Sequence, residues 1–367
     1  MDSSSERHQR ATNHKRPRRP KTEEESKLNS TQVAVDLAKS VFEVAVSRRP
    51  GKVDESHRLS RSRFQRFFAE REPVEVLMEA CGTAHHWGRT LEAMGHRVTL
   101  LPPGDVSRYR DGNKTDRADA KALLEAARND AIDAVPVKSL DQQAIAALHR
   151  VRSGYQQTRT ARINAVRGHL REFGIVIPTG ASRVVPMARA ALEDEGVPAY
   201  LRDVLEEVLD EIESLSEKAK AVQDRLEHLS AQMPEAQALM TIPGIGVLTA
   251  TALGSFVGDV RRFRSGRQLA AYLGLTPREF SSGSSRRLGR ITKRGNSYVR
   301  MLLIHRARSA LRAGKLSDEP DDLRAWALDI ARRKGFNVAA VALANKLARV
   351  AWRVWRDQRP FERRLPA

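Results

Sequence analysis

The stretch STQVAVDLAKSVFEVAVSRRPGKV, residues 30–53, decides the fold because it predicts two strands in immediate succession. Apolar residues alternate with smaller or polar ones from Val33 to Leu37, and the run from Val41 to Val46 is rich in β-branched side chains. This pattern is typical of two antiparallel strands. Asp36 falls inside the first strand, where an acidic residue is unfavourable by propensity. This makes Asp36 a candidate functional residue.

Helices and strands alternate after this pair. A helix is expected around SRFQRFFAERE (62–72), a strand at VEVLMEA (74–80), a short strand at RVTLLPP (97–103) and a further helix within NKTDRADAKALLEAAR (113–128). Such an order is typical of an α/β layout, and it predicts an α/β domain over residues 29–140.

Acidic residues stand at selected places in this domain. Glu79 ends a predicted strand, and Asp116 and Asp119 share one face of the last helix. Like charges three residues apart destabilise an isolated helix slightly. The simple alternative is that aspartates are favoured at helix N-termini, with neutralisation by the nearby cations Lys114, Arg117 and Lys121.

The four carboxylates of Asp36, Glu79, Asp116 and Asp119 become informative as a set. An RNase H-like (RuvC-like) fold brings a first strand, a later strand end and a helix of this order together at one edge of its sheet. Four oxygen ligands there can hold two Mg²⁺ ions about 3.5–4 Å apart, which clamp the attacking and leaving oxygens of a phosphodiester.

Composition points to a polyanionic partner. The chain has 367 residues and a formal net charge of +19, with an isoelectric point near 10.6; nucleic acid is the commonest partner of such a protein. The single cysteine, Cys81, excludes an internal disulfide and suits a reducing cytosol. No apolar run approaches the ~20 residues that span a bilayer, so we expect no membrane partner and a location in the cytoplasm.

Three further regions are expected. Residues 1–28 form a basic arm of disordered composition. Residues 141–235 are predicted to be helical, with a heptad stripe typical of a coiled coil that pairs with a helix of the same chain or of another subunit, or else of a long helix packed on its own domain. The stripe comprises Leu201, Leu205, Val208, Ile212, Leu215, Ala219, Val222, Leu226 and Leu229.

The last region, residues 236–360, combines glycine-rich turns with basic residues. In LMTIPGIGVLTATAL (239–253), Gly244 and Gly246 resemble the turn of a helix-hairpin-helix, whose backbone N–H groups approach phosphates. A plain turn between two helices is the alternative, and nucleic-acid binding is favoured by the flanking Arg261, Arg262, Arg264 and Arg267. A serine-rich segment at 281–285 is expected to be a flexible loop, and Trp352 and Trp355 to be packing anchors of C-terminal helices.

These motifs together resemble the DEDD transposases of the insertion sequence 110 and 1111 families, relatives of Piv-type DNA invertases. The match to their RuvC-like domain lies in VAVDLAKSVFEVAV (33–46), EACGTAHHWGRTL (79–91) and NKTDRADAKAL (113–123). The match to their C-terminal transposase domain lies in IPGIGVLTATAL (242–253), LAAYLGLTPREFSSGSSRRLGRITKRGNSYVRMLLI (269–304) and FNVAAVALANKLARVAW (336–352). Only the basic arm and the acidic GKLSDEPDD segment (314–322) fall outside the resemblance.

The resemblance implies a recombinase. Asp36, Glu79, Asp116 and Asp119 would be catalytic and bind magnesium, and a serine before a glycine would attack the scissile phosphate to form a covalent link to DNA. Here that serine is Ser282, with the neighbouring Ser281 left open. Cations near the phosphates would be Lys293, Arg294 and Arg300.

The resemblance also implies partners. These are duplex DNA at the element ends and target, a structured guide (bridge) RNA, and further copies of the chain in a dimer or tetramer that combines the acids of one subunit with the serine of another. Two other readings of the sequence stay open. One is a RuvC-like nuclease that uses metal-activated water and needs no Ser282; the other is a non-catalytic nucleic-acid-binding protein, which leaves the four acids without a role.

Overall fold

The computed structural model describes residues 31–49, 52–110, 116–129, 131–193, 196–315 and 322–362. The chain divides into two compact units, Met1–Val137 and Lys138–Ala367, each of which is described by itself. The predicted basic arm (1–28) and most of the acidic segment near residue 318 lie outside the described residues. None of the described helices is both long and apolar enough to cross a membrane.

A five-stranded mixed sheet forms the centre of the first unit, with strand order β3-β2-β1-β4-β5. β1 pairs antiparallel with β2, and β2 with β3, whereas β4 and β5 extend the sheet parallel to β1. The two strands predicted from residues 30–53 are thereby confirmed. The strands are β1 (Gln32–Leu37), β2 (Val41–Ser47), β3 (Glu55–Ser60), β4 (Glu75–Glu79) and β5 (Arg97–Leu101).

Helices cover both faces of this sheet. On one face, Phe42 of β2 meets Phe64 edge to face, with ring centroids 4.6 Å apart, in a cluster that α2 and α3 complete. On the other face, Ala34 and Leu77 pack against the apolar side of α5. The helical segments are α2 (Arg61–Ala69), α3 (Ala84–Ala93), the short α4 (Pro103–Val106), the 3₁₀ turn η1 (Ser107–Tyr109) and α5 (Asp116–Ala127).

The edge strand β3 was not predicted. Its sequence, ESHRLS, alternates partly buried and exposed positions but holds a single large apolar residue, Leu59. Polar and charged residues are common on edge strands because they discourage pairing with other chains. The hydrophobic alternation that reveals a buried strand is therefore absent from this one.

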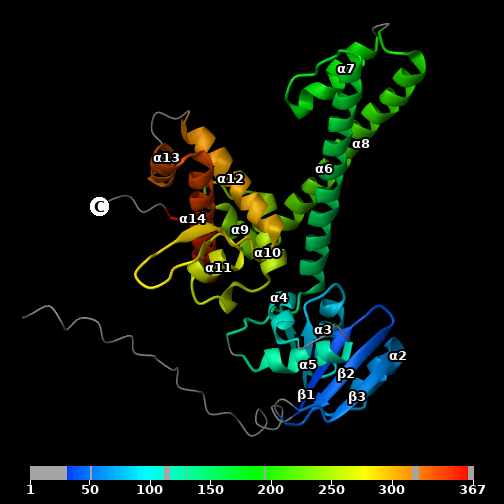
Figure 1. The fold of residues 1–367 in the computed structure, drawn as a ribbon, viewed down its shortest axis with the longest axis vertical. Helices are drawn as coiled ribbons and strands as arrows, with labels where there is room; N and C mark the ends of the chain where they lie inside the picture. Colours follow the sequence, from blue (N-terminus) through cyan, green and yellow to red (C-terminus); the bar gives the residue numbers. More distant parts are fainter. Residues whose placement is uncertain are drawn as a thin grey trace, which may run out of the picture. The chain divides into compact units, whose positions relative to one another are not determined.

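Two long helices begin the second unit. α6 (Leu140–Glu172) has 33 residues and α8 (Ala199–Ser230) has 32, so each is about 50 Å long. They run side by side, and the short η2 (Ala181–Arg183) and α7 (Val184–Leu192) lie near one end of the pair (Figure 1). Ser139 starts α6 through a capping box, in which its hydroxyl accepts from the N–H of Gln142 at 3.1 Å.

The predicted apolar stripe of α8 lies against α6 of the same chain. Leu205, Ile212 and Leu226 are all buried along it. The helices are antiparallel, because the polar pairs between them descend along α8 as they ascend along α6: Arg152–Gln223 (2.8 Å), Arg159–Ser216 (2.6 Å) and Arg162–Glu211 (2.6 Å). That this pair supercoils as a coiled coil stays a prediction.

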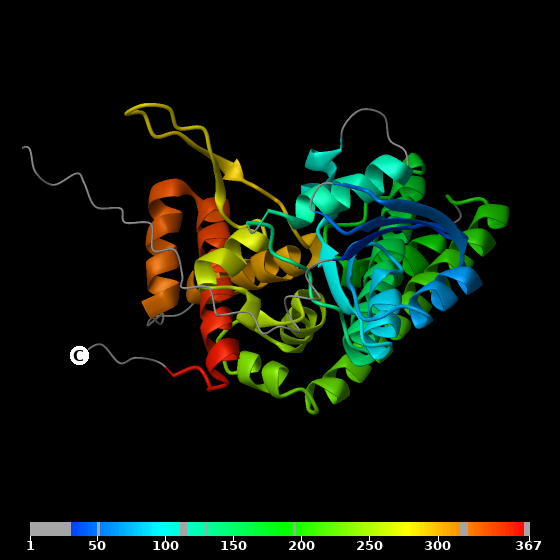
Figure 2. The same cartoon turned by 90° about the horizontal axis from the view of Figure 1, so that it is seen from below.

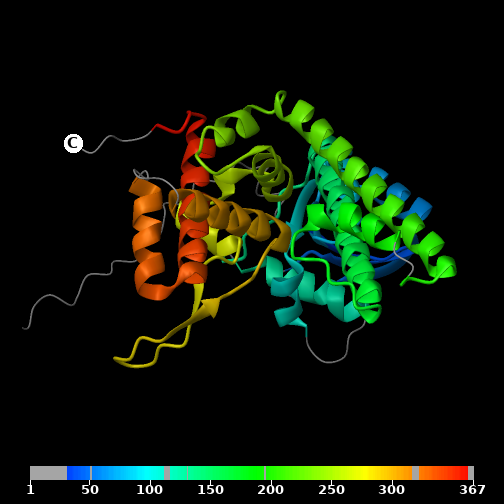
Figure 3. The same cartoon turned by 90° about the horizontal axis from the view of Figure 1, so that it is seen from above.

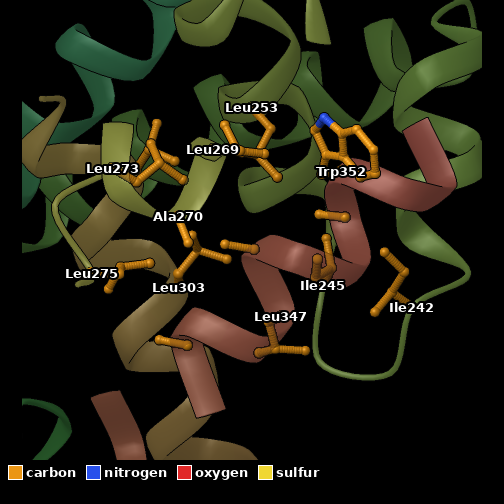
Figure 4. Packing of buried hydrophobic residues seen from close by; sticks show 14 of the residues in the cluster. Ile242, Ile245, Leu253, Leu269, Ala270, Leu273, Leu275, Leu303, Leu347 and Trp352 are labelled. Atoms are coloured by element: carbon orange, nitrogen blue, oxygen red, sulfur yellow. The ribbon is translucent and has the colours of Figure 1, made fainter. Parts of the chain in front are cut away.

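Helices α9 to α14 form the rest of the second unit around one apolar cluster (Figure 4). Trp352 is 8% exposed and its indole N–H donates to the carbonyl of Phe263 at 3.1 Å, so the prediction that Trp352 and Trp355 are packing anchors is confirmed. α12, α13 and α14 contact one another (Figure 3). The elements are α9 (Pro234–Met240), α10 (Val247–Val257), η3 (Val260–Arg262), α11 (Gly266–Tyr272), β6 (Pro277–Glu279), β7 (Leu288–Ile291), α12 (Ser297–Lys315), α13 (Asp322–Lys334) and α14 (Phe336–Asp357).

A buried histidine joins α6 to α10 and α12. His149 Nε2 lies 3.0 Å from the Thr251 hydroxyl, and its Nδ1 lies 3.1 Å from the hydroxyl of Tyr298. Because Thr251 donates its own hydrogen to the carbonyl of Val247 at 2.7 Å, it accepts from Nε2–H, and Nδ1 accepts from Tyr298. Burial lowers the pKa of His149 to about 4, and the positive charge of the nearby Arg152 acts in the same direction.

The free energy of unfolding is expected to fall as the pH drops from about 6.5 towards 4. Over this range the unfolded chain binds a proton at His149 and the folded chain does not, so stability that is complete above the unfolded pKa declines by about 3 kcal/mol. Urea unfolding followed by tryptophan fluorescence measures this slope. His149→Gln should flatten it and the exposed His305→Gln should leave it intact; equal slopes in all three proteins would contradict the assignment.

Candidate active site

Two of the predicted acids lie next to each other at one end of the sheet. β1 and β4 are paired in parallel, with Val35 beside Met78, so the residues that follow, Asp36 and Glu79, occupy neighbouring strand ends. Side chains alternate between the faces of a sheet. Ala34 and its β4 neighbour Leu77 both belong to the apolar cluster beneath α5. Asp36 and Glu79 each lie two residues further along the same strand, so both acids are on the α5 face. Each is partly exposed.

The helix that covers this face carries the third acid. Asp119 lies in α5, is 7% exposed, and accepts a hydrogen bond from the Nε of Arg110. Arg110 comes from the segment that follows the carboxyl end of β5 and η1. Asp116 is the first residue of α5, but its side chain lies outside the described part of the structure. Two of the four predicted acids therefore lie at neighbouring strand ends on the α5 side of the sheet, and a third lies on α5 itself.

A fourth carboxylate on this face escaped the sequence analysis. Glu43 of β2 lies directly opposite Asp36 in the antiparallel register, and therefore on the same side of the sheet. Its carboxylate lies 3.6 Å from Nε of Arg58 on β3. The one signal in the sequence is an acidic residue inside an otherwise largely apolar strand, as for Asp36.

A structural carboxylate, that of Glu75, lies at the opposite end of the same face. Glu75, the first residue of β4, is buried, and three neighbours donate to its carboxylate. These are Arg97 at 2.8 Å, Gln32 at 2.9 Å and Thr99 at 3.3 Å. A carboxylate satisfied in this way has no need of a cation.

Hard carboxylate oxygens of the kind carried by Asp36, Glu79 and Asp119 suit Mg²⁺ or a similar divalent ion. Their residue types and their shared face thus fit a metal. Among the described side chains, however, no three His, Cys, Asp or Glu residues converge closely enough to hold one. The carboxylate of Asp119 accepts a hydrogen bond from Arg110 and is paired with its positive charge.

The serine-rich segment, expected to be a flexible loop, forms the end of a β-hairpin. Ser282 and Ser285 exchange two backbone hydrogen bonds of 3.1 Å each, and Gly283 between them has φ +56°. A glycine with positive φ at the first central position is typical of the type II′ turns that close hairpins. The hairpin projects from the helices of its unit (Figure 2).

Ser281 and Ser282 differ in their hydrogen bonds. The hydroxyl of Ser281 donates to Glu279 at 2.7 Å and accepts from the N–H of Arg287 at 3.1 Å. Ser282 uses its backbone in the turn, and its exposed hydroxyl has no hydrogen-bond partner among the described residues. Ser281 therefore holds the two strands together, whereas the hydroxyl of Ser282 is available.

The predicted cations after the hairpin have two different environments. Lys293 and Arg294 are exposed in a tight turn, where Lys293 has φ +56°. A Cβ on Gly274 would lie 2.4 Å from the carbonyl oxygen of Arg294, so only glycine permits this contact with the end of α11.

Arg300 departs from the expectation of a surface phosphate contact. It is 8% exposed, and its guanidinium donates to the carbonyls of Leu273 at 3.0 Å and Arg294 at 2.6 Å. Burial lowers its pKa. Its contacts position the turn that carries the exposed cations. The sequence could not reveal this, because the carbonyls come from separate turns.

The glycines of the PGIG motif form the connection between α9 and α10. Gly244 has φ +91° and open space around it, and Gly246 is the N-cap of α10. The guanidinium of Arg306 lies 3.1 Å from the position of a Cβ on Gly246. Arg264 and Arg267 are exposed around the start of α11. The turn thus combines open space at Gly244 with the positive charge of Arg306 beside Gly246.

Comparison with known proteins identifies relatives along most of the chain. A DEDD family profile of the IS110 type, described as "Transposase", matches residues 33–175, and the profile "Transposase IS116/IS110/IS902 family" matches residues 236–320. The "Probable family 20 transposase" of Pseudomonas aeruginosa is 41% identical, over 89% of this chain and 96% of the relative. The "Transposase for insertion sequence element IS1111A" of Coxiella burnetii is 37% identical, over 90% of each chain.

A further relative, the "Transposase for insertion sequence element IS1328" of Yersinia enterocolitica, is 36% identical over 88% of this chain and 96% of the relative. The DEDD domain of such proteins implies a requirement for a divalent metal. It also excludes the reading of a non-catalytic binding protein. The chain therefore belongs to the IS110/IS1111 family of insertion-sequence transposases, enzymes that cleave and recombine DNA.

Proposed function

We propose that this transposase cleaves and exchanges DNA strands through a covalent serine–phosphate intermediate, with Ser282 as the nucleophile. The observation that carries the proposal is the contrast at the hairpin tip: the Ser282 hydroxyl is exposed and unengaged, while that of Ser281 is held by Glu279 and Arg287. In the step, the bond from Ser282 Oγ to phosphorus forms and the bond from phosphorus to one deoxyribose oxygen breaks. The hydroxyl proton passes through solvent to the departing oxygen.

The acids of the first unit supply the metal-binding half of this chemistry. We infer an RNase H-like arrangement, supported by the order β3-β2-β1-β4-β5 with an antiparallel and a parallel part. Two Mg²⁺ ions held by Asp36, Glu79, Asp116 and Asp119 would stabilise the charge that develops on the phosphate oxygens. Arg110 is paired with the buried Asp119, and a metal held by Asp119 would compete with this ion pair.

Positive groups of the second unit hold the nucleic acid. The exposed Lys293 and Arg294 lie where they can neutralise phosphates, and Arg300 keeps their turn in place. The Gly244–Gly246 turn with Arg264 and Arg267 adds a second contact with the DNA backbone.

We also assign a structured guide RNA to the protein, which the net charge of +19 supports, together with a dimer or tetramer as the working complex. The place of action is the bacterial cytoplasm, where the DNA lies.

Ser282→Ala is expected to abolish the protein–DNA adduct, because alanine has no oxygen to attack the phosphate. Purified protein, Mg²⁺, RNA from the element's flank and end-labelled donor DNA are incubated, and label that stays with denatured protein is measured. Ser281→Ala loses two hydrogen bonds at the hairpin and should slow adduct formation without preventing it. Strand cleavage by Ser282→Ala at the wild-type rate, with no adduct in either protein, would instead indicate the nuclease alternative with a water nucleophile.

Arg110→Ala is expected to tighten Mg²⁺ binding about five-fold. Removal of a competing ion pair worth about 1 kcal/mol frees the carboxylate of Asp119 for the metal. Calorimetric titration with Mg²⁺ measures the affinity without any DNA. Arg108→Ala is the matched control, because Arg108 lies 3.4 Å from Asp105 in an ion pair on the same segment. Unchanged or weaker binding by Arg110→Ala would show that Asp119 is not a ligand.

A further inference from the structure

A polar hollow lies at the C-terminal end of α6, and none of its lining residues has a role in the proposed cleavage reaction. Its volume is about 350 Å³, and it lies between the last turns of α6 and the segment that follows them. The lining residues are Asn164, Arg167, Gly168, Arg171, Ile177 and Thr179.

The floor of the hollow is open because α6 has a glycine there. Asn164, Gly168 and Arg171 follow one another at intervals of four and three residues, so they share a face of the helix. Nothing lies within 4 Å of the position that a Cβ on Gly168 would take. Glycine inside a helix is about 1 kcal/mol less favourable than alanine, and here it leaves space between two polar side chains.

The wall opposite the helix is held in place by Arg167. One terminal nitrogen of its guanidinium donates to the carbonyl of Pro178 at 2.9 Å and to that of Gly180 at 3.0 Å. Ile177 anchors the same wall in the apolar cluster of α6 and α8. The buried Nε of Arg167 has no hydrogen-bond partner among the described residues.

The charge of the hollow is positive and is not neutralised by its own lining. Two arginines, an amide and a hydroxyl line it, and no carboxylate does. Other arginines of the helix pair are matched by acids: Arg162 pairs with Glu211, and Arg189 with Glu206, Asp210 and Glu213. Arg171 has no ion pair among the described residues.

The end of α6 beside the hollow is closed by backbone hydrogen bonds. The N–H of Gly174 donates to the carbonyl of Arg171, and the N–H of Ile175 donates to that of Leu170.

We propose that this hollow binds a phosphodiester of a nucleic-acid backbone. Arginine guanidinium groups match phosphate oxygens in geometry and charge, and the amide of Asn164 and hydroxyl of Thr179 can donate to the remaining oxygens or to a sugar. The volume exceeds that of a phosphate alone and accommodates the sugar attached to it. DNA and RNA both contain phosphodiesters, so a chain of net charge +19 that acts on DNA can bind this group in either nucleic acid.

The experiment fills the hollow without changing its charge. Gly168→Leu places a side chain in the open floor, and Gly154→Leu is its matched control, because Gly154 is an exposed glycine of the same helix with equally open surroundings. Both changes favour the helix, so neither variant should lose thermal stability. A second pair removes charge: Arg171→Gln at the hollow and Arg162→Gln outside it.

Binding of the full chain to labelled duplex DNA and to labelled single-stranded RNA of equal length is measured at several salt concentrations. Gly168→Leu and Arg171→Gln are expected to weaken binding about ten-fold and to reduce the salt dependence by about one phosphate contact, relative to their controls. Loss with RNA alone, DNA alone or both supports the site and identifies the source of the phosphodiester. Equal affinity of Gly168→Leu and Gly154→Leu for both probes would overturn the proposal. Because no cleavage is measured, the result is independent of Ser282.

Discussion

The parallel register between β1 and β4 is the constraint on which the acidic half of the site depends. It brings Asp36 and Glu79 to neighbouring strand ends, and the alternation of side chains directs both toward α5. A shift of either strand by one residue would move its acid to the opposite face. That face is filled by the aromatic cluster around Phe42 and Phe64, where an unpaired carboxylate would be costly. Core packing thus selects the register, and the register positions the acids.

In the second unit, the turn at residues 293–295 is packed against the helices, whereas the hairpin end at residues 281–285 is exposed. The turn after the hairpin is held by Arg300 and by glycines that allow backbone to approach backbone: a Cβ on Gly295 would lie 2.0 Å from the carbonyl oxygen of Tyr272. Behind this turn, α10, α12 and α14 share one apolar cluster. The hairpin beyond it is exposed along its length. The packed turn at residues 293–295 therefore fixes the position of the hairpin, and the exposed end of the hairpin carries the Ser282 hydroxyl.

Much of this organisation could be predicted from residues 30–128, because runs of apolar and β-branched residues indicate strands that are buried on both faces. The same reasoning failed where local pattern and tertiary environment disagree. β3 is a polar edge strand, and serine and glycine have little strand propensity although 281–285 pair across a hairpin. Arg300 reads as a surface cation, yet its partners are carbonyls from other turns. Glu43 became noticeable only when the register placed it opposite Asp36.

The hairpin also limits how the chain can change in length. Residues along its arms alternate between two sides, and the backbone bonds between Ser282 and Ser285 fix where the chain reverses. One residue added to a single arm would turn the Ser282 side chain to the other side or force a bulge. A pair of residues added to each arm would keep its direction and move it outward by about 7 Å. Reach can therefore change without turning Ser282 only by matched pairs of residues or through a further irregularity like the register shift between Pro277 and Glu279.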